Sequence, residues 1–328
     1  MLSAINVLRG IASILVFFAH YRTISLFSSP NIEFFSMGAY GVDIFFVISG
    51  FVICVMTEKI RRKLNKKNIR VKFFLSRVVR IIFPLWVAII LQYFVVKDYS
   101  GLNNFLMSIA LMPSKNNYYG GSVVYYLEPQ WSLLFEMFFY LSIIIFISNK
   151  NSMLKSIVLI FSVFVLSLLG YDIYIAKPIV IEFLYGILSY QIYRYFNVRK
   201  QEIVIHKSIL LIAILLFFLC AFSLRKQAGD IDSLLRVFSI GLMSFFVVTI
   251  CAMSKELNKV AKKNALMNFL GDISFSLYLL HMVCFRLYEK YFVDINIFML
   301  GVIIVTFVTS FYYLIDKPCH KLSRRLIS

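Results

Sequence analysis

The sequence predicts an all-α, polytopic integral membrane protein with about ten transmembrane helices and both termini in the cytoplasm. Of its 328 residues, 61% are hydrophobic and only 15% are charged, with a mean hydropathy of +0.83. Soluble domains average about 45–50% apolar and about 25% charged residues. Two further observations support this class: repeated apolar runs of membrane-spanning length, and a strongly uneven distribution of Lys and Arg between the loops.

A spanning helix needs about 20 apolar residues. By that rule ten segments are expected to cross the bilayer, at residues 5–26, 40–57, 74–97, 130–148, 153–171, 176–196, 207–224, 233–253, 266–288 and 296–315. The first segment has no basic region before it and no small-residue cleavage site after it, so we expect a retained helix rather than a signal peptide. Neither an internal repeat nor a linker is evident, and we predict one membrane-embedded domain over residues 1–328.

The loops predict the orientation. Residues 58–80 contain ten Lys or Arg, and the loops assigned to the same side hold 25 of the 34 basic residues. Because Lys/Arg bias sets topology, this side is expected to be cytoplasmic. We therefore predict a basic cytoplasmic loop at 58–73 and an outer loop at 98–129. The net charge of +18 is then mainly an orientation signal, with anionic lipid as a secondary partner and no nucleic acid. The five scattered cysteines contain no CxxC pair and indicate neither a metal site nor a disulfide framework.

Two polar residues interrupt the apolar first segment, LRGIASILVFFAH (8–20). Arg9 and His20 are eleven residues apart, about three helical turns, so they share one face and lie roughly 16 Å apart along the axis. Ionisable groups inside spans are costly and by default indicate function. A snorkelling arginine and a hydrogen-bonded interior histidine would give the same pattern.

The second segment begins with GVDIFFVISGF (41–51). Asp43 is expected at nearly the depth of His20, where a carboxylate can fix the tautomer of a catalytic imidazole. Alternatively, Asp43 is an acidic residue favoured at a helix N-terminus. Gly50 follows two turns later and predicts a close approach between helices.

The fourth segment places Ser132 and Glu136 on one face in WSLLFEMFFY (131–140). Glu136 has only apolar neighbours in sequence, so it is a candidate second base, orienter of His20 or ligand of an acceptor hydroxyl. A structural hydrogen bond between helices is the alternative. In ISFSLYLLH (273–281), Ser274, Tyr278 and His281 form a stripe that we interpret first as a polar packing seam.

Arg77 and Arg80 lie where the third segment leaves the cytoplasm, and Pro84 is expected to kink the helix just beyond them. Guanidinium groups bind phosphates well, so this pair and Arg9 are candidates for a polyanionic ligand from the cytosol. Positive-inside anchoring explains any one of them alone. In the outer loop, the tyrosines of NNYYGGSVVYYLEPQ (116–130) could stack on a sugar or form an interfacial belt.

Taken together and in order, these stretches resemble the acyltransferase-3 family of bacterial membrane O-acyltransferases. The matching features are the Arg9–His20 run, GVDIFFVISGF, the arginines before IIFPLW, PQWSLLFEMFFYL and SFSLYLLH. The resemblance implies acetyl transfer from cytosolic acetyl-CoA, a cosubstrate and not a bound cofactor, across the bacterial cytoplasmic membrane to a carbohydrate, either a surface polysaccharide or its lipid-linked precursor. The chain resembles the stand-alone form, without a fused extracytoplasmic domain.

Carried over to this chain, the resemblance makes His20, Asp43 and Glu136 the expected catalytic residues. Arg9, Arg77 and Arg80 are the expected binders of acetyl-CoA. Trp131, Ser132, Tyr278 and His281 are the candidates for binding the acceptor, with no metal involved. A multi-span transporter or flippase is the alternative function, and a non-catalytic scaffold is a third that leaves the charged residues unexplained.

Overall fold

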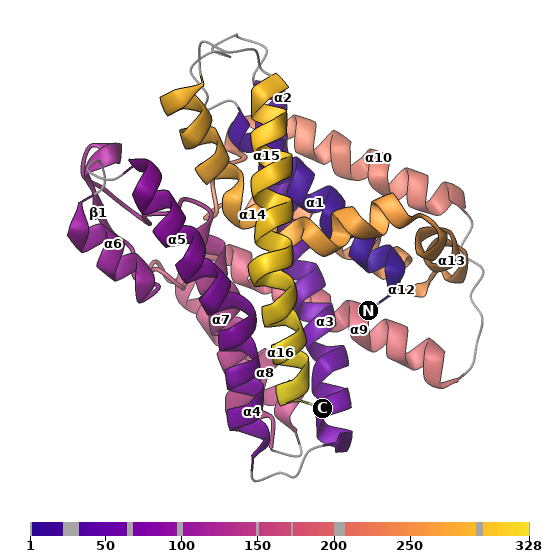
Figure 1. The fold of residues 1–328 in the computed structure, drawn as a ribbon. Helices are drawn as coiled ribbons and strands as arrows, with labels where there is room; N and C mark the ends of the chain where they lie inside the picture. Colours follow the sequence, from indigo (N-terminus) through magenta and orange to yellow (C-terminus); the bar gives the residue numbers. More distant parts are fainter. Residues whose placement is uncertain are drawn as a thin grey trace.

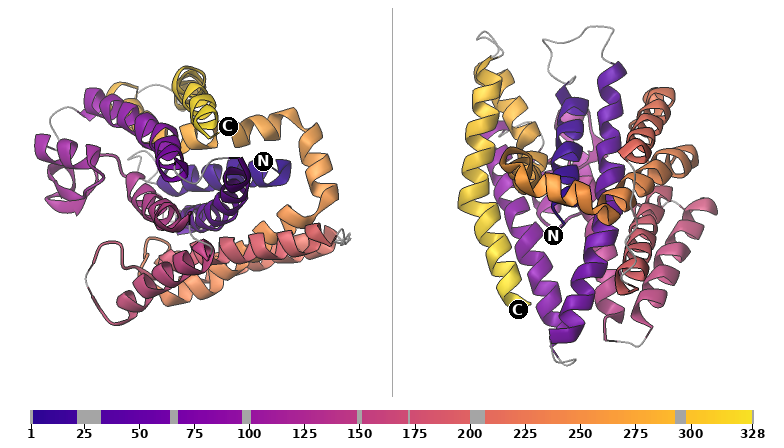
Figure 2. Two further views of the ribbon diagram at one scale, coloured as in Figure 1. Left: turned by 90° about the horizontal axis from the view of Figure 1, so that it is seen from below. Right: turned by 90° about the vertical axis from the view of Figure 1, so that its right-hand side faces the viewer.

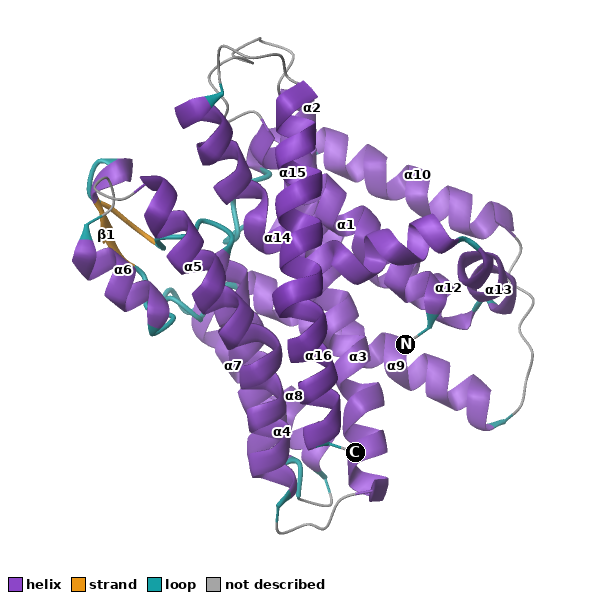
Figure 3. Cartoon of the chain, viewed as in Figure 1, coloured by secondary structure: helices purple, strands orange, loops and turns teal. Residues whose placement is uncertain are grey.

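The protein is a bundle of tilted helices with one small hairpin, as a computed structural model shows (Figures 1 and 3). The structure describes residues 2–21, 33–63, 68–96, 101–148, 151–171, 173–199, 207–292 and 298–327. The α-helices of eight or more residues are α1 (Ser3–Tyr21), α3 (Gly41–Lys63), α4 (Ile69–Arg77), α5 (Phe83–Val96), α6 (Leu102–Ile109), α7 (Gln130–Phe146), α8 (Ser152–Leu168), α9 (Glu182–Val198), α10 (Lys207–Ser223), α12 (Leu242–Met253), α13 (Lys255–Lys263), α14 (Ala265–Tyr291), α15 (Phe298–Phe311) and α16 (Lys317–Leu326).

Short elements complete the chain and often extend these helices. The short helical segments are α2 (Glu33–Ser36), η3 (Met37–Tyr40), η4 (Val78–Ile82), η5 (Asn117–Tyr119), η6 (Pro178–Ile181), η7 (Arg225–Gln227), α11 (Leu234–Arg236), η8 (Val237–Gly241) and η9 (Tyr312–Asp316). Strands β1 (Ser114–Asn116) and β2 (Ser122–Val124) pair antiparallel, with Ser114 opposite Val124.

Every one of the ten predicted segments overlaps a helix, and the all-α membrane class is confirmed. Among the described residues, six helical stretches are long and apolar enough to cross a bilayer, and three apolar helices are shorter. The ten crossings and the cytoplasmic termini stay predictions. Part of the first predicted segment, 22–26, lies outside the described residues.

The two predicted loops contain regular secondary structure. The basic segment 58–73 is largely helical, because α3 continues to Lys63 and α4 begins at Ile69. The outer segment 98–129 contains α6 and the β1–β2 hairpin. Hydropathy does not detect these helices and strands, because they contain many polar residues.

Close contacts between glycines set the helix packing at the centre. A Cβ on Gly50 would lie 2.4 Å from the carbonyl oxygen of Phe183 and 2.8 Å from Cα of Gly186, so the predicted close approach is confirmed between α3 and α9. A Cβ on Gly10 of α1 would lie 2.9 Å from the backbone nitrogen of Gly271 in α14. Helices α1 and α3 consequently lie side by side within the bundle, with α14 and α9 packed on them (Figure 2).

Three π-helical turns, η4, η8 and η9, interrupt the long helices beside charged side chains. A proline lacks an N–H and its ring clashes with the carbonyl four residues earlier, and the wider turn relieves that clash. Pro84 follows η4 and Pro318 follows η9 in this way. The residues Arg80 and Asp316 lie in these same turns, so the backbone irregularities position charged groups.

Candidate active site

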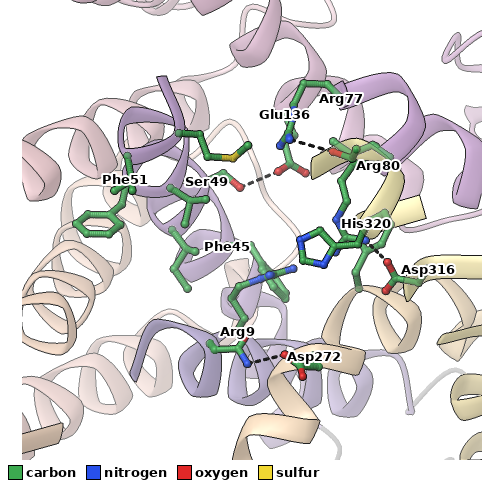
Figure 4. A pocket seen from close by; sticks show the side chains of 18 of the residues that line it. Arg9, Phe45, Ser49, Phe51, Arg77, Arg80, Glu136, Asp272, Asp316 and His320 are labelled. Carbon is green, nitrogen blue, oxygen red and sulfur yellow. Dashed lines mark hydrogen bonds and ion pairs between the residues drawn. The ribbon is translucent and has the colours of Figure 1, made fainter. Parts of the chain in front are cut away.

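A cavity of about 1060 Å³ opens among the ends of α1, α3, α4, α7, α14 and α16. Figure 4 shows charged side chains from several of these helices pointing into it. The basic side chains that line it are Arg9, Lys59, Arg77, Arg80, Lys317, Lys321 and Arg324, whereas the acidic ones are Glu136, Asp272 and Asp316. With histidine neutral, the cavity therefore has an excess of four positive charges. Such a cavity attracts a multiply charged anion.

Arg9 is one of the cations of this cavity that form no ion pair with a described residue. Its guanidinium points into the cavity and forms no hydrogen bond or ion pair with any described residue (Figure 4). The neighbouring acid, Asp272, instead accepts a hydrogen bond of 2.8 Å from the side chain of Asn6. An arginine left without a partner in a cavity is suited to bind an anionic ligand.

The two other predicted arginines are held by protein groups. Arg77 is 6% exposed and donates to the hydroxyl of Ser76 at 2.9 Å, with its guanidinium over the rings of Phe73 and Tyr140. Its buried Nε has no partner among the described residues. Arg80 forms an ion pair with Asp316. The structure thus brings all three predicted arginines to one cavity, and it leaves the charge of Arg9 the least compensated.

Glu136 lines the cavity from α7. Its Oε1 accepts hydrogen bonds from Ser49 at 2.8 Å and from Tyr140 (Figure 4). Its Oε2 forms no hydrogen bond with the described residues, and Glu136 lines the cavity. Glu136 is therefore fixed by two hydroxyl groups on the side of the arginines.

A polar line leads from the cavity toward His20. Ser132 and Tyr278 line the cavity and their hydroxyls are 2.5 Å apart, and Tyr278 also donates to the carbonyl of Pro129 at 2.9 Å. The ring centroids of Tyr278 and His281 are 6.1 Å apart, and those of His281 and His20 are 5.0 Å apart. Three of the four residues predicted to bind the acceptor, Ser132, Tyr278 and His281, therefore lie one after another between the cavity and His20.

Both histidines have a defined tautomer. Nδ1 of His20 lies 3.0 Å from the carbonyl oxygen of Val16, and Nδ1 of His281 lies 3.2 Å from that of Leu277. A carbonyl can only accept, so each Nδ1 carries the proton. Nε2 of His281 is buried without a hydrogen-bond partner in the described part of the chain. The two imidazole rings thus lie close together where α1 and α14 pack.

The profile of the family described as "Acyltransferase domain" matches residues 2–315. The chain belongs to the acyltransferase-3 family. It is also 25% identical over 265 residues to "Exopolysaccharide production protein ExoZ" of Rhizobium meliloti (strain 1021), covering 75% of this chain and 76% of that protein. No solved structure matches the chain. The family decides the class: the protein is a multi-pass membrane acyltransferase, not a transporter.

Asp43 is predicted to assist His20, but the structure pairs it with Arg236. Asp43 is fully buried and its two carboxylate oxygens accept from Arg236, at 3.0 and 2.7 Å. Arg236 also donates to the carbonyls of Ala228 and Asp230. Because both oxygens of Asp43 are occupied, the geometry makes it the anionic half of a buried ion pair.

Aromatic residues predicted for the outer side are packed against other protein groups. Trp131 is not among the described residues that line the cavity, and it packs edge-on against Phe46 and Phe135. Tyr125 and Tyr126 are 1% and 2% exposed, so they cannot stack on a sugar at the surface.

Tyr118 and Tyr119 are bound instead by Arg286 of α14, which also pairs with Glu128. Burial and the adjacent Glu128 carboxylate raise the pKa of Tyr119. These contacts attach the β1–β2 hairpin to α14.

Several site residues of the acyltransferase were missed from the sequence. Ser49 and Tyr140 position Glu136. Tyr140 follows Glu136 by four residues on α7, so the i, i+4 rule would have found it, whereas no spacing rule points to Ser49 on α3. His320 points into the cavity from α16, beyond the last predicted segment (Figure 4). Glu182 and Arg236 lie inside predicted segments, and the rule that intramembrane charges need partners would have identified both.

Proposed function

We propose that this acyltransferase moves an acetyl group from cytosolic acetyl-CoA to a hydroxyl of a surface polysaccharide or its lipid-linked precursor, in the bacterial cytoplasmic membrane. The observation that carries the proposal is a cavity with excess positive charge, containing the unpaired Arg9, from which a polar line runs to His20. The name of the similar rhizobial protein, which refers to exopolysaccharide production, supports the choice of a polysaccharide acceptor.

The basic residues of the cavity support acetyl-CoA as the acyl donor. Acetyl-CoA has a diphosphate near its nucleotide end and a thioester at the end of a long flexible arm. Arg9 and Arg77 are placed to bind the diphosphate, since guanidinium groups form strong charge-assisted bonds to phosphate oxygens. Arg80 contributes less, because Asp316 already neutralises it. The arm would then extend past Ser132 and Tyr278.

His20 is the proposed general base. Its Nδ1–H donates to Val16, so Nε2 is the atom that would take the proton of the acceptor hydroxyl as that oxygen attacks the thioester carbonyl. The carbon–sulfur bond then breaks and the thiolate of CoA leaves. Transfer through a transient acetyl-histidine is a variant that uses the same nitrogen as nucleophile. Glu136 supplies a negative charge near Arg9 and Arg77.

The test is acetyl transfer by purified protein in lipid nanodiscs from labelled acetyl-CoA, with glycan from cells lacking the gene as acceptor. We expect His20→Ala to lower the rate at least a hundredfold, in the range of general base catalysis. Phe18→Ala is the matched control, because Phe18 lies on the same helix and is 41% exposed. Wild-type transfer by His20→Ala would refute the mechanism. A wild-type protein that transfers no acetyl group would refute the donor.

A further inference from the structure

Helix α16 forms one wall of the cavity with a stripe of basic residues. Lys317, His320, Lys321 and Arg324 are spaced at i, i+3, i+4 and i+7, so they share one face, and all four line the cavity. From the sequence alone, Lys317, Lys321 and Arg324 contribute only to the predicted orientation. Lys321 and Arg324 form no ion pair or hydrogen bond with any described residue, so their charges are not compensated.

Both ends of α16 are fixed in place. At its start, Asp316 pairs with Arg80 and accepts a hydrogen bond of 3.0 Å from Ser276. Near its end, the buried hydroxyl of Ser323 lies 2.9 Å from that of Ser76. Cys319 and Ser323 form the buried face, and the basic stripe is therefore held toward the cavity.

The cations that line the cavity differ in how deeply they are buried. Arg77 is buried and Arg80 is largely buried, whereas Lys321 and Arg324 are exposed at the outer end of the same wall. In acetyl-CoA the diphosphate lies between the thioester arm and the adenosine, and the 3′-phosphate is on the ribose beyond it. A donor with its thioester toward Tyr278 and its diphosphate at Arg9 therefore places its 3′-phosphate at the mouth of the cavity.

We propose that Lys321 and Arg324 of α16 form a subsite for the 3′-phosphate of CoA and make the enzyme discriminate against 3′-dephospho-CoA. The inference rests on the proposed function for the identity of the donor. A phosphate monoester carries about −1.5 to −2 charges at pH 7. Two uncompensated cations, one turn apart on a fixed helix, match such a charge.

The experiment compares binding of CoA and of 3′-dephospho-CoA to the full-length protein in nanodiscs, by titration calorimetry. For the wild type we expect CoA to bind at least tenfold more tightly. Lys321→Ala and Arg324→Ala should each weaken CoA binding about five- to tenfold and leave 3′-dephospho-CoA within twofold. Arg325→Ala is the matched control, because it removes the same charge from the same helix at a position that does not line the cavity.

Equal affinity of the wild type for both compounds would overturn the subsite, and so would variants that weaken both equally. Acetyl transfer by the same preparations separates this inference from the proposed function. Transfer from both acetylated donors at equal KM leaves the proposed function intact and refutes the subsite. Tighter binding of CoA that depends on Arg324, without acetyl transfer, refutes the proposed reaction and leaves the subsite.

Discussion

Replacing Asp43 with asparagine tests whether this carboxylate stabilises the fold or takes part in the reaction. Asparagine has nearly the same size and can still accept a hydrogen bond, but it removes the charge. Asp43 is 0% exposed and the side chain of Arg236 is 2% exposed, so the variant leaves a buried guanidinium without its anion. Removing one member of a buried ion pair costs about 3–5 kcal/mol of unfolding free energy.

Two features of the structure place the expected loss at the lower end of that range. Arg236 keeps its hydrogen bonds to the carbonyls of Ala228 and Asp230. Glu182, buried beside the pair, has two carboxyl oxygens without a hydrogen bond to described residues and can serve as a substitute anion. We therefore expect a loss of about 3 kcal/mol for Asp43→Asn and a larger loss when Glu182→Gln is added.

The assay measures thermal unfolding of the purified protein, with acetyl transfer per folded molecule recorded well below the transition. Asp43→Asn should unfold at a lower temperature and retain the wild-type KM for acetyl-CoA and a rate within about threefold. The double variant Asp43→Asn with Arg236→Met should recover part of the stability, because it contains no unpaired buried charge. A variant with wild-type stability whose rate falls about a hundredfold would show that Asp43 acts in the chemistry and would refute this reasoning.

Two further predictions concern packing and the outer side. Gly50→Ala should lower the free energy of unfolding by about 1–3 kcal/mol, because its Cβ would lie 2.4 Å from a backbone oxygen of α9. Gly301→Ala, with no atom within 4 Å of its Cβ, should not destabilise, and equal effects would contradict the packing argument. Arg286→Gln should release the β1–β2 hairpin and raise its cleavage rate by an added protease at least tenfold. Lys115→Gln, exposed on β1, is the control, and an unchanged cleavage rate in Arg286→Gln would show that the network does not hold the hairpin.

The helices could be predicted from the sequence because hydropathy is a local property. Each apolar run must satisfy its backbone hydrogen bonds within itself, so its length and position fix a helix almost without regard to neighbours. Arg9, Arg77 and Arg80 are predicted on one side of the membrane, and the three line one cavity. Arginine side chains are long, so three of them on the same side can reach one cavity even when the rotation of each helix about its axis is unknown.

The rotation of each helix about its own axis could not be predicted, and the error at Asp43 follows from that. His20 and Asp43 were expected at nearly the same depth, but α1 turns His20 toward His281 of α14. Helix α3 turns Asp43 toward Arg236. The sequence shows that Arg236 is available as an opposite charge, but it does not show which helix faces are in contact. That depends on packing, such as the contact of Gly50 with α9.

The C-terminal helix shows how a charge can have two roles at once. Its basic residues follow the last apolar run, where Lys and Arg are normally explained by membrane orientation. Orientation, however, requires only that the charges stay on the cytoplasmic side, and it does not require them to share a helical face. The contacts of Asp316 and Ser323 turn that face into the cavity. A charge needed only for topology could lie on any face of α16, so the fixed orientation of four basic residues toward one cavity favours a bound polyanion.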